Sequence, residues 1–367
     1  MIRLAPIPAG LPATVPFVGP ETLERRSGRS FAARLGANEN GFGPSPRAVA
    51  AMQAAATEAW KYGDPTSHDL THALAAHHDA RPENIVVGEG IDGLLGLLVR
   101  LLVGPGDRVV TSDGAYPTFN FHVPGFGGVL DTVPYRNDAE DPQALIDRAT
   151  DTGARLVYLA NPDNPMGSWH DGRAIEAMLD LMPADCLLVL DQAYGEFAPA
   201  SAIPAIASDD PRVIRMRTFS KAYGMAGARV GYAIGHPDLI AAFDRVRNHF
   251  GVNRIGQAGA LAALADRDWL AQTVARVAAA RDRISAIATD NGMTALPSAT
   301  NFVAVDTGCD GAFARGLVDA LAAEGVFVRM PGVAPLNRCI RISCAPDAEL
   351  DVLAQALPRV LDRLRSA

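Results

Sequence analysis

The stretch Arg217–Gly235, RTFSKAYGMAGARVGYAIG, decides the fold and contains one of only two lysines in the chain. The sequence has 33 lysine and arginine residues, and all of them except Lys61 and Lys221 are arginine. Lysine differs from arginine in one respect that matters here: its amine can lose a proton and form a Schiff base with an aldehyde. The position of Lys221 alone fits an ordinary surface lysine. The residues around it must decide between a surface lysine and a reactive amine.

Short apolar runs precede and overlap this stretch, and each ends near a Gly, Asn or Asp. They are NIVVG (84–88), RVVTS (108–112), RLVYLAN (155–161), CLLVLD (186–191), VIRMR (213–217) and VGYAIG (230–235). Continuous apolar character predicts strands that are buried on both faces. Helical patterns over 91–103 and 172–182 lie between them. The alternation predicts an α/β fold, with a three-layer large domain built on a mainly parallel, mixed sheet.

The pattern changes after about residue 236. Helical stretches are expected over 237–250 and from about 256 to 290, then around 311–324 and from about 347. Between them lie the strand-like runs NFVAVD, VFVRM and CIRISC. We therefore expect a smaller α+β domain over 241–367, a large domain over 35–240, and an N-terminal segment over 1–34 that packs with the small domain.

Composition excludes several classes of protein. A formal net charge of −8 over 367 residues argues against a broad electrostatic contact with nucleic acid or anionic membrane. The four cysteines form no CxxC pair, so neither a zinc site nor a disulfide framework is expected, and scattered thiols suit a cytoplasmic location. The N-terminus is interrupted by prolines and does not resemble a signal peptide. The longest apolar run, GLLGLLVRLLVG, is too short to span a bilayer.

Polar residues gather at the ends of the predicted strands, where open α/β sheets bind ligands. VVGEGIDGLL places Gly88 and Gly90 between a strand and a helix, and the N–H groups near Ile91 and Asp92 could hold a phosphate. An ordinary tight turn is the alternative interpretation. No GK[ST] follows, so the segment is not a P-loop.

Two further strand ends carry side chains suited to a ligand. In LANPDNPMGSW, the Asn164 amide could donate a hydrogen bond, although the segment could also be only a rigid turn. In LLVLDQAYGEF, Asp191 follows a buried strand and Tyr194 comes three residues later. A buried carboxylate needs a partner. A helix N-terminus, an arginine or a protonated ring nitrogen would each serve.

Together these motifs resemble the fold-type I pyridoxal-phosphate aminotransferases of class I and II, and most closely the histidinol-phosphate aminotransferase branch. The resemblance extends from LGANENGFGPSP (35–46) to CIRISCAPDAEL (339–350). Its most specific parts are SKAYGMAGARVGY, NPDNPMG and DQAY.

The resemblance implies pyridoxal 5'-phosphate as cofactor. Lys221 would form the Schiff base and carry the proton, Asp191 would pair with the pyridinium nitrogen, and Tyr194 would bond the ring's phenolate oxygen. The full set of implied cofactor contacts is Gly90, Ile91, Asp92, Tyr116, Asn164, Asp191, Tyr194, Thr218, Ser220, Lys221, Arg229 and, from a neighbouring subunit, Tyr62. The implied substrate contacts are Arg341, Arg329 and Asn40, and no metal is implied.

The implied reaction moves an amino group from a donor to 2-oxoglutarate in amino-acid biosynthesis, within a homodimer. The donor would be L-histidinol phosphate or an aromatic or other amino acid. The chain departs from the family pattern at Met166, Gly63, Phe250–Gly251, Ile91 and Gly93, which bears on the substrate and on the subunit interface.

Other functions remain open at this point. A pyridoxal-phosphate lyase or decarboxylase, similar to the threonine-phosphate decarboxylases, would use the same cofactor residues. A binding module of a regulator would need a DNA-binding segment, and none is apparent. His68 and His72 could share one helical face and bind a metal, but no HExxH glutamate accompanies them, so a solvated helix face is expected.

Overall fold

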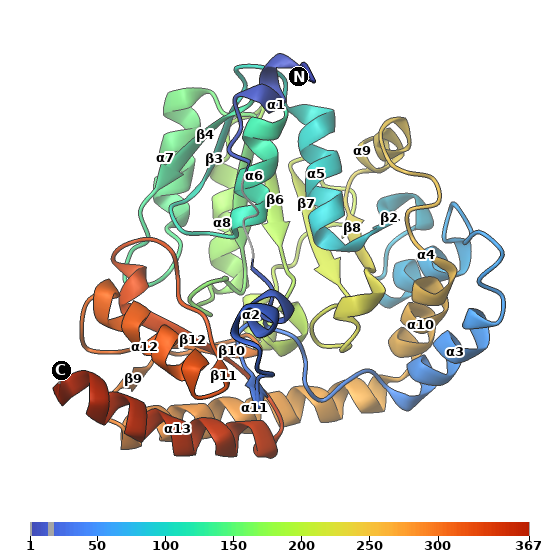
Figure 1. Cartoon of the computed structure of the whole chain (residues 1–367). Helices are drawn as coiled ribbons and strands as arrows, with labels where there is room; N and C mark the ends of the chain where they lie inside the picture. The colour runs from blue at the N-terminus through green and yellow to red at the C-terminus, as the bar shows by residue number, and fades with distance from the viewer. Residues whose placement is uncertain (1, 14–17, 367) are drawn as a thin grey trace.

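A seven-stranded sheet forms the centre of the computed structural model, which describes residues 2–13 and 18–366 (Figure 1). In spatial order its strands are β2 (Ile85–Gly88), β8 (Gly231–Ile234), β7 (Val213–Thr218), β6 (Leu187–Asp191), β5 (Leu156–Ala160), β3 (Arg108–Ser112) and β4 (Val129–Val133). Strand β8 pairs antiparallel with both of its neighbours, and the other pairs are parallel. The prediction of a mainly parallel, mixed sheet is confirmed.

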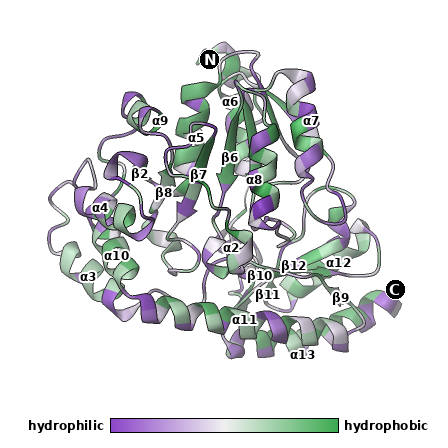
Figure 2. Cartoon of the chain, turned by 180° about the vertical axis from the view of Figure 1, so that it is seen from behind, coloured by the Kyte–Doolittle hydropathy of each residue, from purple (hydrophilic) through white to green (hydrophobic). Residues whose placement is uncertain are grey.

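Helices cover both faces of this sheet and make three layers (Figures 1 and 2). Consecutive strand residues point to opposite faces, and Val109 and Val110 accordingly belong to different core clusters. Helices α5 (Gly90–Leu102) and α6 (Pro117–Gly125) pack on the Val109 side. Helices α7 (Pro142–Thr152) and α8 (Gly172–Leu181) pack on the Val110 side. Burial on both faces explains why these strands read as continuous apolar runs.

A second group of helices lies at the β2–β8 edge. It contains α3 (Pro46–Ala56), α4 (His68–His77) and α10 (Arg254–Ala265), which share one core cluster with β2 and β8. Figure 1 shows these three helices together beside that edge of the sheet.

The remaining C-terminal elements form a smaller α+β part. Strands β12 (Cys339–Ser343), β10 (Phe302–Asp306) and β9 (Thr294–Ala295) make an antiparallel sheet. Helices α11 (Arg267–Asp290), α12 (Gly311–Ala323) and α13 (Asp347–Ser366) pack around it. The N-terminal region contributes α1 (Pro6–Ala9), α2 (Pro20–Ser27) and β1 (Ala33–Arg34), and β1 pairs with β11 (Val326–Phe327). The division at residues 34 and 240 stays a prediction.

Three elements differ from the sequence expectation. The helix expected over 237–250 is only α9 (Pro237–Ala242) and a 3-10 turn. Towards the end of that range, the Asn248 side chain accepts the Phe250 N–H and favours a local turn over a helix. The helix expected over 256–290 is two helices. Asp266 ends α10, and its side chain accepts the Trp269 N–H and caps α11. Strand β4 was not expected.

Candidate functional site

The carboxyl ends of β5, β6 and β7 meet over a cavity of about 1180 Å³. Strand β6 ends at Asp191, β7 is followed by Ser220 and Lys221, and the loop after β5 carries Asn164. These residues line the cavity together with Ile91, Asp92, Tyr116, Tyr194, Thr218, Arg229, Arg329 and Arg341. Parallel strands bring their carboxyl ends to one edge, so residues far apart in the sequence share one site.

Lys221 lies inside this cavity. Its Nζ donates to the Asn38 carbonyl oxygen over 3.1 Å and lies 5.6 Å from the centre of the Tyr194 ring. Burial, reinforced by the positive charge of Arg341, lowers the pKa of Lys221 to about 8. The amine can therefore be neutral at mildly alkaline pH, which a nucleophile requires.

Asp191 lies at the back of the cavity, and both of its oxygens are occupied. Oδ1 accepts the Ala193 N–H over 2.9 Å, and Oδ2 accepts the Tyr158 hydroxyl over 2.7 Å. Burial raises the pKa of Asp191, while the hydrogen bond from Tyr158, the Ala193 N–H and the charge of Lys221 oppose that rise. Among the described residues, neither a helix N-terminus nor an arginine hydrogen-bonds this carboxyl group.

Asn38 connects several of the predicted site residues. It adopts φ of 54°, donates to the Tyr194 hydroxyl over 3.1 Å and accepts the Lys221 amine on its carbonyl. On the other wall, Arg341 donates to Asn164 Oδ1 over 2.6 Å. Asn38 also donates its N–H to the Ser343 hydroxyl of β12. Arg341 is on the same strand, so both sets of contacts attach to the small sheet.

A cradle for an anion lies at the start of α5. Gly90 has φ of +80°, and a Cβ there would come within 2.5 Å of Arg229 Nη2. A Cβ at Gly231 would come within 2.8 Å of the Gly90 carbonyl carbon and the Ile91 nitrogen. Ser220 accepts from Arg229 over 3.5 Å and from Thr218 over 2.9 Å. Hydroxyls, a guanidinium and a helix N-terminus thus face one space.

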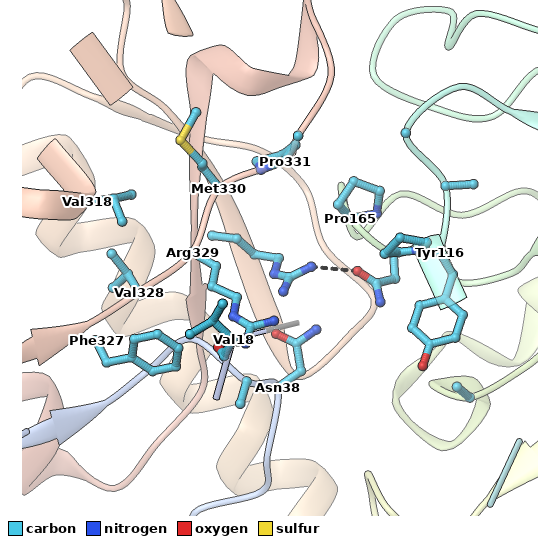
Figure 3. Close-up of a pocket in the computed structure, with 18 of the residues that line it drawn as sticks. Val18, Asn38, Tyr116, Pro165, Val318, Phe327, Val328, Arg329, Met330 and Pro331 are labelled. Carbon is cyan, nitrogen blue, oxygen red and sulfur yellow. Dashed lines mark hydrogen bonds between the residues drawn. The ribbon is translucent and has the colours of Figure 1, made fainter. Parts of the chain in front are cut away.

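Arg329 and Arg341 lie side by side on the cavity wall that the smaller C-terminal part contributes. Their backbones pair antiparallel, with the Arg341 N–H donating to the Arg329 carbonyl over 2.6 Å. Burial, together with the positive charge of Arg329, lowers the pKa of Arg341 to about 10. Figure 3 shows Arg329 beside Phe327 and Val18, across the cavity from Tyr116 and Pro165. Arg329 donates to the Val18 carbonyl over 2.8 Å.

Three predicted site residues do not line the cavity: Gly90, which lies beside Arg229 at its edge, Asn40 and Tyr62. The Asn40 amide donates to the carbonyls of Lys221 and Ala222, at 3.0 and 3.2 Å, so it holds the lysine segment. Tyr62 is 76% exposed and packs on Phe250 with ring centres 4.6 Å apart. Nothing in this single chain places Tyr62 near Lys221.

Two of the departures from the family pattern have local explanations. A Cβ at Gly251 would overlap the Glu89 carboxylate at 1.6 Å, so the glycine makes room for Glu89. A Cβ at Gly63 would lie 2.8 Å from the Val252 carbonyl oxygen, so the backbone leaves little space for a side chain. Met166 is buried in a small cluster with Leu336 and Cys339.

Several cavity residues were not predicted from the sequence. They are Asn38, Tyr158 and the residues of α2 and α12 that form the outer wall, Leu23, Arg26, Arg315 and Val318. The resemblance quoted the LGANENG segment that contains Asn38, but no local signal identified Tyr158, which lies within an apolar strand. His68 and His72 stack with ring centres 4.0 Å apart. The described residues contain no group of three or more His, Cys, Asp and Glu side chains that could hold a metal.

Comparison with protein families gives a match over most of the chain. The family described as aminotransferase class I and II matches residues 33–357. The chain is 35% identical to the histidinol-phosphate aminotransferase of an Anaeromyxobacter species over 368 residues, which covers 98% of this chain and 100% of that protein. It is also 35% identical to histidinol-phosphate aminotransferase 1 of Mesorhizobium japonicum, over 98% and 96% of the two chains.

Solved structures agree with these matches. The histidinol-phosphate aminotransferase of Sinorhizobium meliloti, crystallised with pyridoxal-5'-phosphate, superposes with a TM-score of 0.96 at 56% identity, covering 100% of this chain and 98% of that one. The aspartate aminotransferase of Thermus thermophilus with maleate has a TM-score of 0.81 at 22% identity over 98% and 100% of the chains, and supports the fold alone. No helix within the described residues is long and apolar enough to cross a membrane.

Proposed function

Since the chain belongs to the class I and II aminotransferases and is a pyridoxal-phosphate-dependent transaminase, we propose that its amino donor is L-histidinol phosphate and its acceptor 2-oxoglutarate. We also propose that the cavity around Lys221 is the active site and that the enzyme works as a homodimer.

The residues of the cavity fit the cofactor. The space at Gly90, which a Cβ would fill, together with Arg229, Ser220 and Thr218, suits a phosphate. The buried Asp191 suits a protonated ring nitrogen, and Lys221 suits the aldehyde carbon. Tyr116, the residue before α6, lines the same space and suits the ring face.

When bound, the cofactor supplies an electron sink that stabilises a carbanion next to the transferred nitrogen. The chain supplies the rest. Lys221 Nζ, with its pKa lowered to about 8, takes and returns the proton at carbon. Asp191 would hold the charge of the ring nitrogen, and Tyr194 and Asn164 would bond the ring oxygen. Walls from the large and small parts of the chain both line the space that the reacting atoms would occupy.

The paired arginines carry the proposal for the donor. Their backbones bond to each other, so two guanidinium groups share one wall, and the Nε of Arg341 is buried without a partner among the described residues. Two adjacent cations match a phosphate monoester, which concentrates two negative charges on one group, whereas glutamate carries its two charges on separate carboxylates. The 56% identical relative from Sinorhizobium meliloti is itself named for histidinol phosphate.

An aromatic amino acid is the second candidate donor. Part of the cavity wall is apolar and is formed by Phe31, Phe327 and Val318. Such a surface suits a flat aromatic ring. The lyase and decarboxylase alternatives have no support from the relatives compared, which are all named as aminotransferases.

Our proposal of a homodimer rests on three exposed aromatic residues. Trp60, Tyr62 and Phe250 are 78%, 76% and 49% exposed. Clustered exposed aromatics mark protein interfaces. We propose that Tyr62 reaches the cofactor phosphate of the neighbouring subunit across this patch.

The test is an absorbance titration of the purified holoenzyme with L-histidinol phosphate, then with glutamate and aromatic amino acids. Conversion of the lysine-bound cofactor spectrum to the pyridoxamine phosphate spectrum, reversed by 2-oxoglutarate, is the expected result. If only an aromatic amino acid converts it, the donor assignment is wrong and the transaminase chemistry stands.

The Lys221→Ala variant should lose covalent cofactor binding. A Lys221→Ala protein that turns over at the normal rate would refute the site assignment.

A further inference from the structure

A tyrosine that the proposed mechanism has not yet used lies directly behind Asp191. Tyr158 is on β5, has 0% of its surface exposed and stacks on Phe119 with ring centres 4.5 Å apart and ring planes 18° apart. Its side chain also lines the cavity. The ring is therefore held rigidly, while the hydroxyl points at one defined acceptor.

That acceptor is Asp191 Oδ2, at 2.7 Å. The Ala193 N–H binds the other oxygen at 2.9 Å. Two donors, one on each oxygen, fix the rotation of the carboxyl group and leave further lone pairs toward the cavity. Asp191 is thus oriented before any ligand arrives.

The other groups that act on Asp191 do not replace this hydrogen bond. Among the described residues, Lys221 is the one cation that lowers the pKa of Asp191. Its amine would be occupied once it bonded the aldehyde of the cofactor. Glu140 is also buried nearby, and burial raises its pKa well above the ordinary value. A carboxyl group adds no positive charge near Asp191. An ionised Asp191 therefore depends on donors such as Tyr158.

We propose that Tyr158 is a positioning residue that keeps Asp191 ionised and so keeps the shared proton on the ring nitrogen of the cofactor. This inference rests on the role proposed above for Asp191. It concerns a side chain that contacts the carboxylate, and it assigns no chemical step to the tyrosine itself.

The direction of the effect follows from proton sharing. A pyridinium and a carboxylate share one proton, and a donor to the carboxylate oxygen lowers its basicity. Without the Tyr158 hydroxyl, the carboxylate becomes more basic and the proton moves toward Asp191. The ring then loses positive charge and withdraws electrons less well.

A simpler interpretation is that Tyr158 only fills the core against Phe119. In that case a phenylalanine would serve equally well, because the stacked ring is retained. The two interpretations differ in what the removal of a single oxygen atom does to the cofactor.

The experiment uses the Tyr158→Phe holoenzyme reconstituted with pyridoxal phosphate labelled with ¹⁵N in the ring, at one fixed pH. The ¹⁵N chemical shift of wild type should be that of a protonated ring, and that of the variant should move toward the neutral pyridine value. Removal of the amino donor's proton should slow by about tenfold or more, the size expected for one hydrogen bond to a charged group.

Tyr232→Phe is the matched control. Tyr232 is buried and hydrogen-bonds His78 over 2.8 Å, so the control also loses a bonded hydroxyl from the core but does not touch Asp191. Tyr232→Phe should lower the melting temperature by about as much as Tyr158→Phe does. It should leave the ¹⁵N chemical shift of the cofactor unchanged. A Tyr158→Phe shift identical to wild type would overturn the inference.

Two results keep this inference separate from the proposed function. A neutral ring in wild type would refute the role of Asp191 itself, whatever the variant shows. A protonated ring in both proteins would refute only the role of Tyr158. With a ring-N-methylated cofactor, whose charge is permanent, the rate difference between wild type and Tyr158→Phe should shrink; an unchanged difference would also count against the inference.

Discussion

At the scale of single residues, the site depends on a lysine amine held by groups from distant parts of the chain. Lys221 donates to the carbonyl of Asn38, and Arg341 on the opposite wall adds positive charge. A cation in a buried, positively charged space releases its proton more easily than in water. This environment distinguishes Lys221 from Lys61, which is exposed and forms an ion pair with Glu58.

The lowered pKa predicts how cofactor capture by the cofactor-free protein depends on pH. The neutral amine is the nucleophile, so below the Lys221 pKa of about 8 the capture rate should rise about tenfold per pH unit. Above that pH it should level off. Stopped-flow absorbance would measure the rate. Lys61→Ala should follow the wild-type profile, and a profile centred near the ordinary lysine pKa would contradict the prediction.

Replacing Arg329 should slow the reaction of one substrate more than that of the other. Arg329→Gln removes one of two adjacent cations, so capture of the phosphate-bearing donor should weaken by about tenfold or more. Glutamate carries its two negative charges on separate carboxylates, so neither group needs both arginines, and its capture should be less affected. The half-reaction rate constants with each substrate give the ratio. Equal losses with both would argue that Arg329 does not contact a phosphate.

At the scale of elements, a buried ion pair joins the two segments that carry the site. Glu196 follows Tyr194 by two residues, and Arg217 precedes Thr218 at the end of β7. Their side chains bond over 3.0 Å, with only 7% and 12% of their surfaces exposed. A Cβ at Gly195 would lie 2.8 Å from the same guanidinium. The pair therefore holds the segment after β6 against the end of β7.

Breaking this pair should destabilise the fold far more than breaking a surface pair. Glu196→Ala leaves a buried, unpaired arginine and should cost about 3–5 kcal/mol of unfolding free energy. The double change Glu196→Leu with Arg217→Met should recover most of that loss. Asp180→Ala, which breaks an exposed pair with Arg212, should cost about 1 kcal/mol or less. Denaturant unfolding of the apoprotein measures all three, and equal losses for Glu196→Ala and Asp180→Ala would contradict the argument.

At the scale of the whole molecule, one chain presents an incomplete site under the proposed function. Tyr62 lies on the surface with Phe250, away from the cavity that Lys221 lines. A symmetric dimer would place the same patch of both chains against each other. The exposed aromatics would then be buried, and each Tyr62 would serve the partner's cavity.

Subunit complementation tests this arrangement. Tyr62→Ala and Lys221→Ala proteins, each weakly active or inactive, are unfolded together and reassembled. Random pairing makes half of the dimers hybrids with one intact site each, so about a quarter of wild-type activity should return. A mixture of Lys221→Ala and Asp191→Ala proteins should recover no activity. Each change disables the site of its own chain, so a hybrid dimer has no intact site. No recovery in the first mixture would refute a Tyr62 shared across the interface.

The sequence by itself determined the features that a short segment encodes. Buried strands appear as continuous apolar runs, and the residues that follow them, Asp191, Ser220 and Lys221, are placed by topology once the sheet is parallel. Edge strand β4 escaped prediction because its pattern, VLDTV, is partly exposed and lacks such a run. The break at Asp266 escaped because a single side-chain cap decides it.

Only the tertiary structure decided which side chains act on those residues. Asn38 meets Lys221 across 183 positions of the sequence, and Tyr158 meets Asp191 across 33. The pairing of Arg329 with Arg341 likewise needs two separate segments of the chain to meet. No local pattern marks such contacts, because each depends on how sheets and helices pack around a shared cavity. The chemistry of the lysine was therefore readable from the sequence, and its environment only from the fold.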